Sequence, residues 1–164
     1  MKTHLANEEG SIMVITLLVM AILTVLGISA INQSNIDMLI SGNERQYKQN
    51  FFRAEGAANE AVQRVDNAAG DDLMPENDAF NWLQDENDWP TGSIENPVNW
   101  NDANSTVSLM DPNTRFAVVM TGVAGGASLD ITAPSQLFEF EIHGRYLRNN
   151  VGWSQVALGY RKRF

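Results

Sequence analysis

The feature that most constrains this chain of 164 residues is an uncharged, apolar run of twenty residues at positions 12–31. A helix rises about 1.5 Å per residue, so the run is long enough to cross the roughly 30 Å hydrocarbon core of a bilayer. Its polar members Thr16, Thr24 and Ser29 have hydroxyls that can bond back to carbonyls of the same helix, and Gly27 permits close helix approach. The run therefore predicts a helix that resides in a membrane or packs against other apolar helices.

A cleaved secretory signal is a poorer interpretation of this run. Such signals have a basic start, an apolar core of about 7–15 residues and a small-residue cleavage site. Here the core is longer, Lys2 is the only basic residue before it, and Ile28-Ser29-Ala30 matches a cleavage site poorly. A plain membrane anchor fits the length equally well, so the choice depends on the sequence that follows.

Helical spacing continues beyond the apolar run, across residues 36–65. Apolar side chains recur there at steps of three and four, at Ile36, Leu39, Ile40, Tyr47, Phe51, Ala54, Ala58, Ala61, Val62 and Val65. Glu44 and Lys48 form an i,i+4 pair in the favoured order, and Ser41-Gly42-Asn43 predicts a kink, local melting or a break. We predict a helix over residues 11–65, apolar all round in its first half and along one stripe in its second.

The charge of the chain is concentrated in its second part. The net charge is −9, and fourteen of the twenty Asp and Glu residues lie at or beyond position 66. Nucleic-acid binding is driven by basic patches, so this composition argues against a nucleic-acid partner. The chain has no cysteine, which excludes disulfides, thiolate metal sites and a thiol nucleophile.

Residues 66–104 form an acidic, turn-rich segment with ten Asp and Glu residues and no Lys or Arg. Three tryptophans in it indicate a long, partly packed loop and not a disordered linker, with a short helical turn at residues 77–83. The acids Asp85, Glu86 and Asp88 could ligate calcium, but their spacing does not match an EF-hand, and a solvated acidic surface is the favoured interpretation.

Alternating apolar and polar residues predict three strands, at residues 114–123, 136–147 and 153–164. In the second strand Phe138, Phe140 and Ile142 share one face, and Glu139, Glu141 and His143 share the other. Gly125-Gly126 and Asn149-Asn150 lie at predicted turns, and the second pair makes a hairpin.

These elements predict an α+β fold in which the long helix packs on a small antiparallel sheet. We expect Phe51, Phe52 and Val62 to form the helix–sheet contact. The basic Arg161-Lys162-Arg163 run could meet the acidic loop, a neighbouring subunit or lipid headgroups, or it could be a solvated chain end.

The sequence offers no catalytic constellation. There are two histidines: His4 lies in the amino-terminal segment, and His143 alternates outward as an ordinary surface residue. Phosphate-cradling glycine loops and metal-binding motifs are absent from the sequence. We therefore expect no enzyme activity, cofactor or metal.

Three stretches carry a resemblance to a known family. Gly10 precedes the apolar run as in a prepilin peptidase site. Residues 38–61 have the spacing of a recurrent motif, with Ser41-Gly42-Asn43-Glu44-Arg45, then Phe51, then Ala54-Glu55 and Ala61. A small β-rich domain completes the layout. Over about its first 65 residues the chain resembles type IV pilin-like proteins, in particular the PilX family of minor pilins, with a pilin-like fold.

The resemblance implies a division of the chain and a role for each part. Residues 1–10 would be a leader peptide, 11–35 the transmembrane or assembly half of the helix, and 36–65 its amphipathic half. Residues 66–164 would be an exported globular domain, with an acidic loop at 66–113 and a β-sheet at 114–164. The implied site residues are Gly10 for cleavage, Ser11 for methylation, Ile12, Val14, Ile15, Leu18, Ile22, Leu26, Gly27 and Ile31 for assembly, and Gly42, Asn43, Arg45, Phe51, Ala54 and Glu55 for the family motif.

The implied location is the bacterial inner membrane, crossed once with the carboxy-terminal domain in the periplasm, and later the pilus at the cell surface. The implied partners are inner-membrane lipid, prepilin peptidase, other minor pilins and the major pilin. The implied function is priming or supporting pilus assembly at or near the tip, with which a role in adhesion is compatible.

The sequence departs from the family pattern at two places. A typical pilin carries glutamate as the fifth residue of the mature chain, where it is thought to pair with the amino terminus of a neighbouring subunit; here that residue is Ile15. An amine buried in an apolar core is costly without such a partner, so the absence argues for a rare or tip-proximal subunit. Leader peptides normally end in basic residues, whereas Glu8-Glu9 precede Gly10 here.

Two alternatives stay open at the level of sequence. A minor pseudopilin of type II secretion would share the same mechanism. A single-pass membrane protein whose exported β domain binds a ligand or a surface would need no fibre at all.

Overall fold

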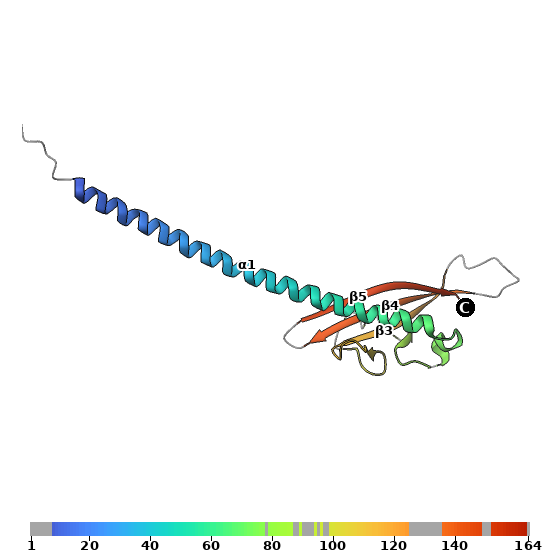
Figure 1. Cartoon of the computed structure of the whole chain (residues 1–164). Helices are drawn as coiled ribbons and strands as arrows, with labels where there is room; N and C mark the ends of the chain where they lie inside the picture. Colours follow the sequence, from blue (N-terminus) through green and yellow to red (C-terminus); the bar gives the residue numbers. More distant parts are fainter. Residues whose placement is uncertain are drawn as a thin grey trace, which may run out of the picture. The chain divides into compact units, whose positions relative to one another are not determined.

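The computed structural model describes residues 8–77, 79–86, 89, 94, 96, 99–124, 136–148 and 152–163. Figure 1 shows one long helix and a sheet. The elements in order are α1 (Glu8–Asn67), the 3-10 turns η1 (Asp71–Leu73) and η2 (Pro75–Asn77), and the strands β1 (Leu83–Asp85), β2 (Thr106–Val107), β3 (Thr114–Val123), β4 (Leu137–Arg148) and β5 (Gly152–Arg163). The contacts divide the chain into two compact units, Met1–Arg45 and Gln46–Phe164.

Helix α1 is longer than predicted, beginning at Glu8 and ending at Asn67. Its helical backbone is continuous through Ser41-Gly42-Asn43, so the prediction of a break or local melting there is wrong. A single glycine costs a helix only about 1 kcal/mol relative to alanine, which the neighbouring turns can absorb.

The sheet follows the strand order β1-β3-β4-β5, and β2 also pairs with β3. Strands β3, β4 and β5 match the three predicted from alternation to within one residue at each end. Their pairings are antiparallel, as expected, but β1 pairs parallel to β3, so the sheet is mixed and not purely antiparallel. The sequence missed β1 because a strand of three residues is too short to show alternation.

A bulge interrupts the pairing of β3 with β4 between Met120 and Gly122. Gly122 has a φ of 121°, a left-handed conformation that favours glycine. The bulge lies near the end of β3, so the rest of that strand keeps a regular register with β4.

One face of the sheet packs against the second half of α1. The shared core consists of Ala57, Ala58, Ala61 and Val65 of α1, Leu73, Trp82 and Leu83 from the segment that follows, and Phe116, Val118, Phe138, Phe140 and Ile142 of the sheet. The alanine stripe of α1 and the even-numbered residues of β3 and β4 therefore face each other, which confirms the predicted apolar faces.

The opposite face of the sheet is also covered, which alternation alone did not predict. Trp89 and Trp100 pack there against Ala117 and Val119 of β3, with Ile94 at the margin. The two indole rings meet edge to face with centroids 5.8 Å apart. The tryptophan-bearing segment is thus packed, as its composition indicated, and it forms a third layer.

Two expectations about individual side chains are wrong. Phe51 and Phe52 are exposed and do not form the helix–sheet contact, whereas Val62 packs against the core as predicted. His143 is only 4% exposed and is not a surface residue, because the third layer covers its face of the sheet.

Turns were predicted with mixed success. The prediction of a helical turn at residues 77–83 is wrong for the described residues of that range. The 3-10 turn η2 ends at Asn77, and β1 begins at Leu83. The turns predicted at Gly125-Gly126 and Asn149-Asn150 lie outside the described residues. Arg148 nevertheless pairs with Gly152, as a hairpin between β4 and β5 requires.

Candidate functional site

The apolar half of α1 presents its side chains outward in every direction. Its best window has a mean hydropathy of 2.7 and none of it is buried within the structure, so by length and composition it can cross a membrane. The predicted assembly residues Ile12, Val14, Ile15, Leu18, Ile22, Leu26 and Ile31 each expose more than half of their surface. A helix apolar all round needs apolar surroundings supplied from outside the chain.

The polar atoms of this segment are satisfied within the helix. Thr16 Oγ1 donates to the carbonyl of Ile12, and Ser29 Oγ donates to the carbonyl of Val25. Thr24 makes the same bond one turn back along the helix. These bonds confirm the prediction from sequence, and they leave an almost entirely apolar surface for lipid or protein.

The residues implied for processing lie on the same helix. Gly10 and Ser11 are exposed, and a Cβ atom on Gly10 would meet no atom within 4 Å. Gly27 has equally open surroundings. Among the residues that the structure describes, none therefore hinders access to the Gly10–Ser11 bond.

The predicted family motif divides between the two units. Gly42, Asn43 and Arg45 lie in the first unit and are exposed. In the second unit Phe51 is 38% exposed, Glu55 is half-buried and Ala54 is fully buried. Of the motif residues, Ala54 and Ala61 belong to the face that packs on the sheet.

The helix lies very close to the sheet at Gly144 of β4, a residue that sequence reasoning missed. A Cβ atom there would lie 2.1 Å from the carbonyl oxygen of Ala54 and 2.6 Å from the amide nitrogen of Ala58. The glycine and the small alanine side chains therefore let the two backbones come together. A glycine in the middle of a strand is the signal that could have indicated this contact.

Polar clamps on either side hold the helix to the sheet. Glu60 Oε2 accepts hydrogen bonds from Ser108 Oγ at 2.6 Å and from the Leu109 amide at 2.9 Å, while Glu60 Oε1 pairs with Arg64. Burial raises the pKa of Glu60, but the bonds from Ser108, Arg64 and Leu109 outweigh it, so the pKa lies below its usual value. The carboxylate thus fixes the turn before β3 to α1.

A second clamp centres on Arg53. Its guanidinium donates to the hydroxyl of Tyr146 at 2.7 Å, lies over that ring, and is 3.5 Å from Asp111 Oδ2. The pKa of Asp111 is lowered by bonds from Asn113 and by Arg53, against the opposing effect of burial. The clamp joins α1 to β4 and to the loop before β3.

The carboxy-terminal end of α1 is capped by a residue of the last strand. Lys162 Nζ donates to the carbonyls of Val65 at 2.7 Å, Asp66 at 2.9 Å and Ala68 at 2.8 Å. Tyr160 OH donates to Asp66 Oδ1 at 2.6 Å, a bond that raises the pKa of Tyr160. Lys162 therefore has a structural role that favours neither a lipid contact nor a free chain end.

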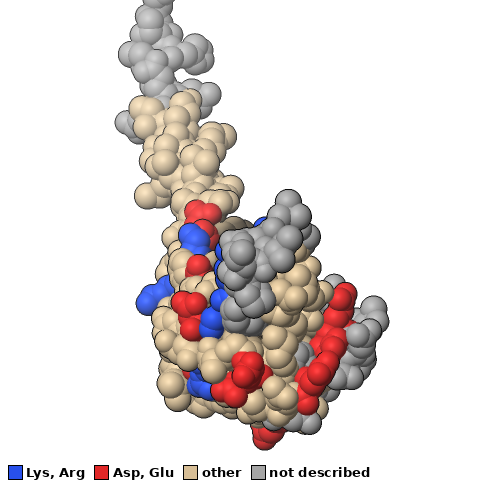
Figure 2. Space-filling view, turned by 90° about the vertical axis from the view of Figure 1, so that its right-hand side faces the viewer, with Lys and Arg blue, Asp and Glu red and all other residues tan. Residues whose placement is uncertain are grey.

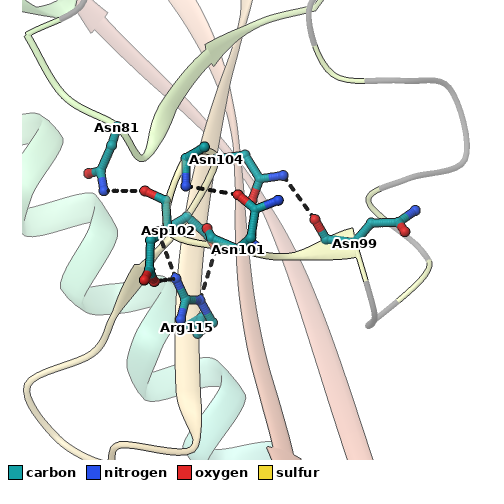
Figure 3. A network of polar contacts seen from close by, with 8 residues as sticks. Asn81, Asn99, Asn101, Asp102, Asn104 and Arg115 are labelled. Atoms are coloured by element: carbon teal, nitrogen blue, oxygen red, sulfur yellow. Dashed lines mark hydrogen bonds and ion pairs between the residues drawn. The ribbon is translucent and has the colours of Figure 1, made fainter.

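A polar network anchors the third layer to β3, as Figure 3 shows. Arg115 pairs with Asp102 Oδ1 at 2.5 Å, and its Nε donates to Ser105 Oγ at 2.9 Å. The Asn101 and Asn104 side chains accept bonds from the backbone and shape the turn between them. The network holds residues 99–105 against the sheet, beside the two tryptophans.

Arg145 and His143 of β4 lie under this layer. Arg145 is buried, lies 4.8 Å from the centroid of the Trp100 ring, and has a pKa lowered to about 10 by burial and by Arg115. His143 Nε2 is 3.5 Å from Glu141 Oε1, and burial lowers the pKa of the imidazole although Glu141 opposes the shift. Neither ring nitrogen of His143 has a hydrogen-bond partner among the described residues.

The charged surface of the second unit is uneven. Figure 2 shows a row of Asp and Glu side chains on one side of the face in view, apart from the Lys and Arg side chains. Across the part of the chain that the structure describes, no group of three or more His, Asp or Glu side chains is arranged to hold a metal ion.

The comparison with known families favours one interpretation of the helix. Residues 9–59 match the family model described as PilX N-terminal. This part of the chain is therefore similar to the amino-terminal region of the PilX family. No curated protein and no solved structure matches it. The PilX N-terminal match begins just before Gly10 and includes the predicted motif from Ser41 to Glu55, but it ends before Ala61.

The similarity of residues 9–59 to PilX N-terminal supports a type IV pilus minor pilin and interaction with other pilus components. This family is one of structural pilins and not of enzymes. The long apolar helix fits membrane anchoring and location in a pilus. The exposed apolar surface of α1 is therefore the candidate functional site.

Proposed function

We propose that this chain is a minor pilin that primes or supports assembly of a type IV pilus at or near its tip. Cleavage after Gly10 and methylation of Ser11 would release the mature subunit from its leader. The observation that carries the proposal is the fully exposed apolar surface of residues 12–31 within the region that matches PilX N-terminal.

Assembly exchanges one apolar environment for another. In the membrane the side chains of this segment meet acyl chains, and in a fibre they meet neighbouring helices. The hydrophobic effect contributes little to such an exchange, so packing and buried polar contacts must drive it. The back-bonded hydroxyls of Thr16, Thr24 and Ser29 support this view, because they expose almost no unsatisfied polar group to either environment.

A rare, tip-proximal position is supported by Ile15. The resemblance places a glutamate at this position in typical pilins, and Ile15 offers no carboxylate to the amino terminus of a neighbouring subunit. A subunit at the end of a fibre need not provide that partner, whereas a repeating subunit would leave a charged amine unpaired in an apolar core.

The decisive experiment is the mass and amino-terminal sequence of the membrane-bound protein, expressed with and without a prepilin peptidase. We expect a chain that begins at methylated Ser11 only when the peptidase is present. Gly10→Val should abolish cleavage, and Gly27→Val is the matched control, since both glycines are exposed on the same helix with open surroundings. A chain that keeps its first ten residues in every case would leave a simple membrane anchor as the better function.

The tip position has its own test. Deleting the gene should reduce the number of pili, and an epitope tag on the globular unit should label fibre ends only. Labelling along the whole fibre would contradict the tip assignment while leaving the pilin function intact.

A further inference from the structure

The last strand of the sheet is a long open edge. Strand β5 (Gly152–Arg163) ends the strand order and pairs with β4 on one side, and none of the described strands pairs with its other side. Figure 1 shows β5 on the outer side of β4. The opposite margin of the sheet is different, since β3 is flanked there by the short strands β1 and β2.

The backbone groups that β5 turns outward can be identified from the register. The carbonyl of Leu137 accepts from the Ala124 amide, and the Leu147 amide donates to the Asn113 carbonyl, so the odd-numbered residues of β4 point away from β5. The even-numbered residues of β4 therefore bond to β5, and their partners are the even-numbered residues of β5. The odd-numbered residues of β5 then direct their N–H and C=O groups outward, from Trp153 to Arg163.

Features that normally protect an edge are missing from most of β5. The strand contains no proline and no acidic residue, and its register with β4 is regular over all twelve residue pairs. Residues 154–160 are uncharged, and the basic residues lie at one end only. Natural sheets usually cover, twist or charge a strand of this length, because its unpaired backbone is a template for another strand.

We propose that the outer edge of β5 binds an extended, acidic strand of another polypeptide by β-strand addition. Only another extended backbone can match a row of alternating N–H and C=O groups. Arg161 and Arg163 lie among the outward-directed residues at the carboxy-terminal end, and both are exposed. Arg161 also pairs with Glu139 of β4, so Arg163 is the main candidate for a new carboxylate. An antiparallel partner with carboxylates at its amino end would place them beside these arginines.

The surroundings of the edge also favour a partner with a different sequence from β5. A second copy of β5 carries no carboxylate and cannot complement the arginines. At the other end of the strand Trp153 is 52% exposed and offers apolar surface to the carboxy-terminal part of the added strand. The inference does not depend on the pilin function, because it uses only the globular unit.

The test uses a defined probe and the full, uncleaved chain in detergent micelles. The probe is a fluorescent twelve-residue peptide that begins with two glutamates and then alternates threonine and valine. Its binding is measured by fluorescence anisotropy. We expect saturable binding that weakens about tenfold in Ala157→Pro, because proline removes an outward N–H and leaves the bonds to β4 in place.

Matched controls separate edge pairing from loss of folding. Ala157→Ser changes the same exposed side chain but keeps its N–H, so binding should stay within about twofold of the wild type. If Ala157→Pro disturbs the fold, a peptide N-methylated at alternate residues tests the same bonds with the protein unchanged, and it should also bind about tenfold more weakly.

Three results would overturn the proposal. These are no saturable binding at millimolar peptide, equal binding by Ala157→Pro and the wild type, or equal binding of the N-methylated peptide. If the protein associates with itself, Ala157→Pro abolishes this association and no peptide binds, then the edge pairs with a second copy of the chain. That result would overturn the proposal of an acidic partner. Failure of peptidase processing would refute the pilin function and would leave this result unaffected.

Discussion

Replacing Gly144 by alanine is the sharpest test of how α1 is held on the sheet. The added methyl group would lie 2.1 Å from the carbonyl oxygen of Ala54, 2.6 Å from the amide nitrogen of Ala58 and 2.9 Å from its Cβ. Two of these atoms belong to the helix backbone and the third is fixed to it. No flexible side chain can therefore move aside, and the helix itself must shift.

The size of the effect follows from this geometry. Moving the Ala54 carbonyl to an ordinary contact distance requires a displacement of roughly 1 Å. Such a shift loosens the whole contact between α1 and the sheet, since Ala57, Ala61 and Val65 lie in the same core. Overpacking a tight core costs about 3 kcal/mol at the upper end of its usual range, and this site belongs there. The loss corresponds to a fall of roughly 10 °C in Tm for a unit of this size.

The assay is thermal unfolding of the full chain in detergent micelles, followed by tryptophan fluorescence. Gly159→Ala in β5 is the matched control, because a Cβ atom there would meet nothing within 4 Å. That control should change stability by no more than about 0.5 kcal/mol. Ala58→Gly should rescue Gly144→Ala only in part, because it leaves the clash with the Ala54 carbonyl in place.

A Tm for Gly144→Ala within about 2 °C of the wild type would refute this reasoning. It would mean that helix and sheet separate at little cost and that their close approach is not what stabilises the unit. Full rescue by Ala58→Gly would show instead that the alanine side chain, and not the backbone, sets the contact.

Two further predictions concern the charged groups of the globular unit. Lys162→Met should lower the free energy of unfolding by about 1–2 kcal/mol, because three carbonyls at the end of α1 lose their donor. Urea unfolding measures this loss, and Arg163→Met, at an exposed residue, is the control. An equally small loss in both variants would contradict the capping role. The pKa of His143 lies below its ordinary value of 6.5, so protonation favours the unfolded chain, and stability should fall as the pH drops below about 6.5. The lowered pKa of Glu60 adds a second loss below pH 4.5, its ordinary value, as its carboxylate is protonated and releases the turn at Ser108. His143→Leu should flatten the decrease in Tm between pH 7 and pH 5, and an unchanged decrease would exclude His143 as its cause.

The parts of the fold that could be predicted from sequence are those with a long local pattern. The apolar run of α1 needs only its own twenty residues to specify a helix that requires apolar surroundings. Strands β3, β4 and β5 are long enough for alternation to show, and each was predicted to within a residue or so. Strands β1 and β2, with three and two residues, are specified by pairing with β3 and have no pattern of their own.

In the candidate site, too, some features could be predicted from the sequence and others depend on tertiary contacts. The exposed assembly residues of α1 follow from composition, because an apolar side chain in this segment is exposed whichever way it points, within the described part of the chain. The Gly144 contact and the Lys162 cap join residues about 90 positions apart or more, and no local pattern contains them. Both the Gly144 contact and the Lys162 cap form because α1 packs across the sheet.

By itself, the sequence determined that this chain has an apolar helix for lipid or other helices, an amphipathic continuation, and strands with two unlike faces. Only the tertiary structure decided which side chains those faces bury. Alternation shows that His143 and Ile142 lie on opposite faces of the sheet, but not that the layer with Trp89 and Trp100 covers the face of His143. Helical spacing places Phe51 and Ala54 on one stripe, but it does not show which of the two meets Gly144. The physical reason is that burial depends on which distant segments pack together, and small residues at the point of closest approach decide that packing as much as large apolar ones do.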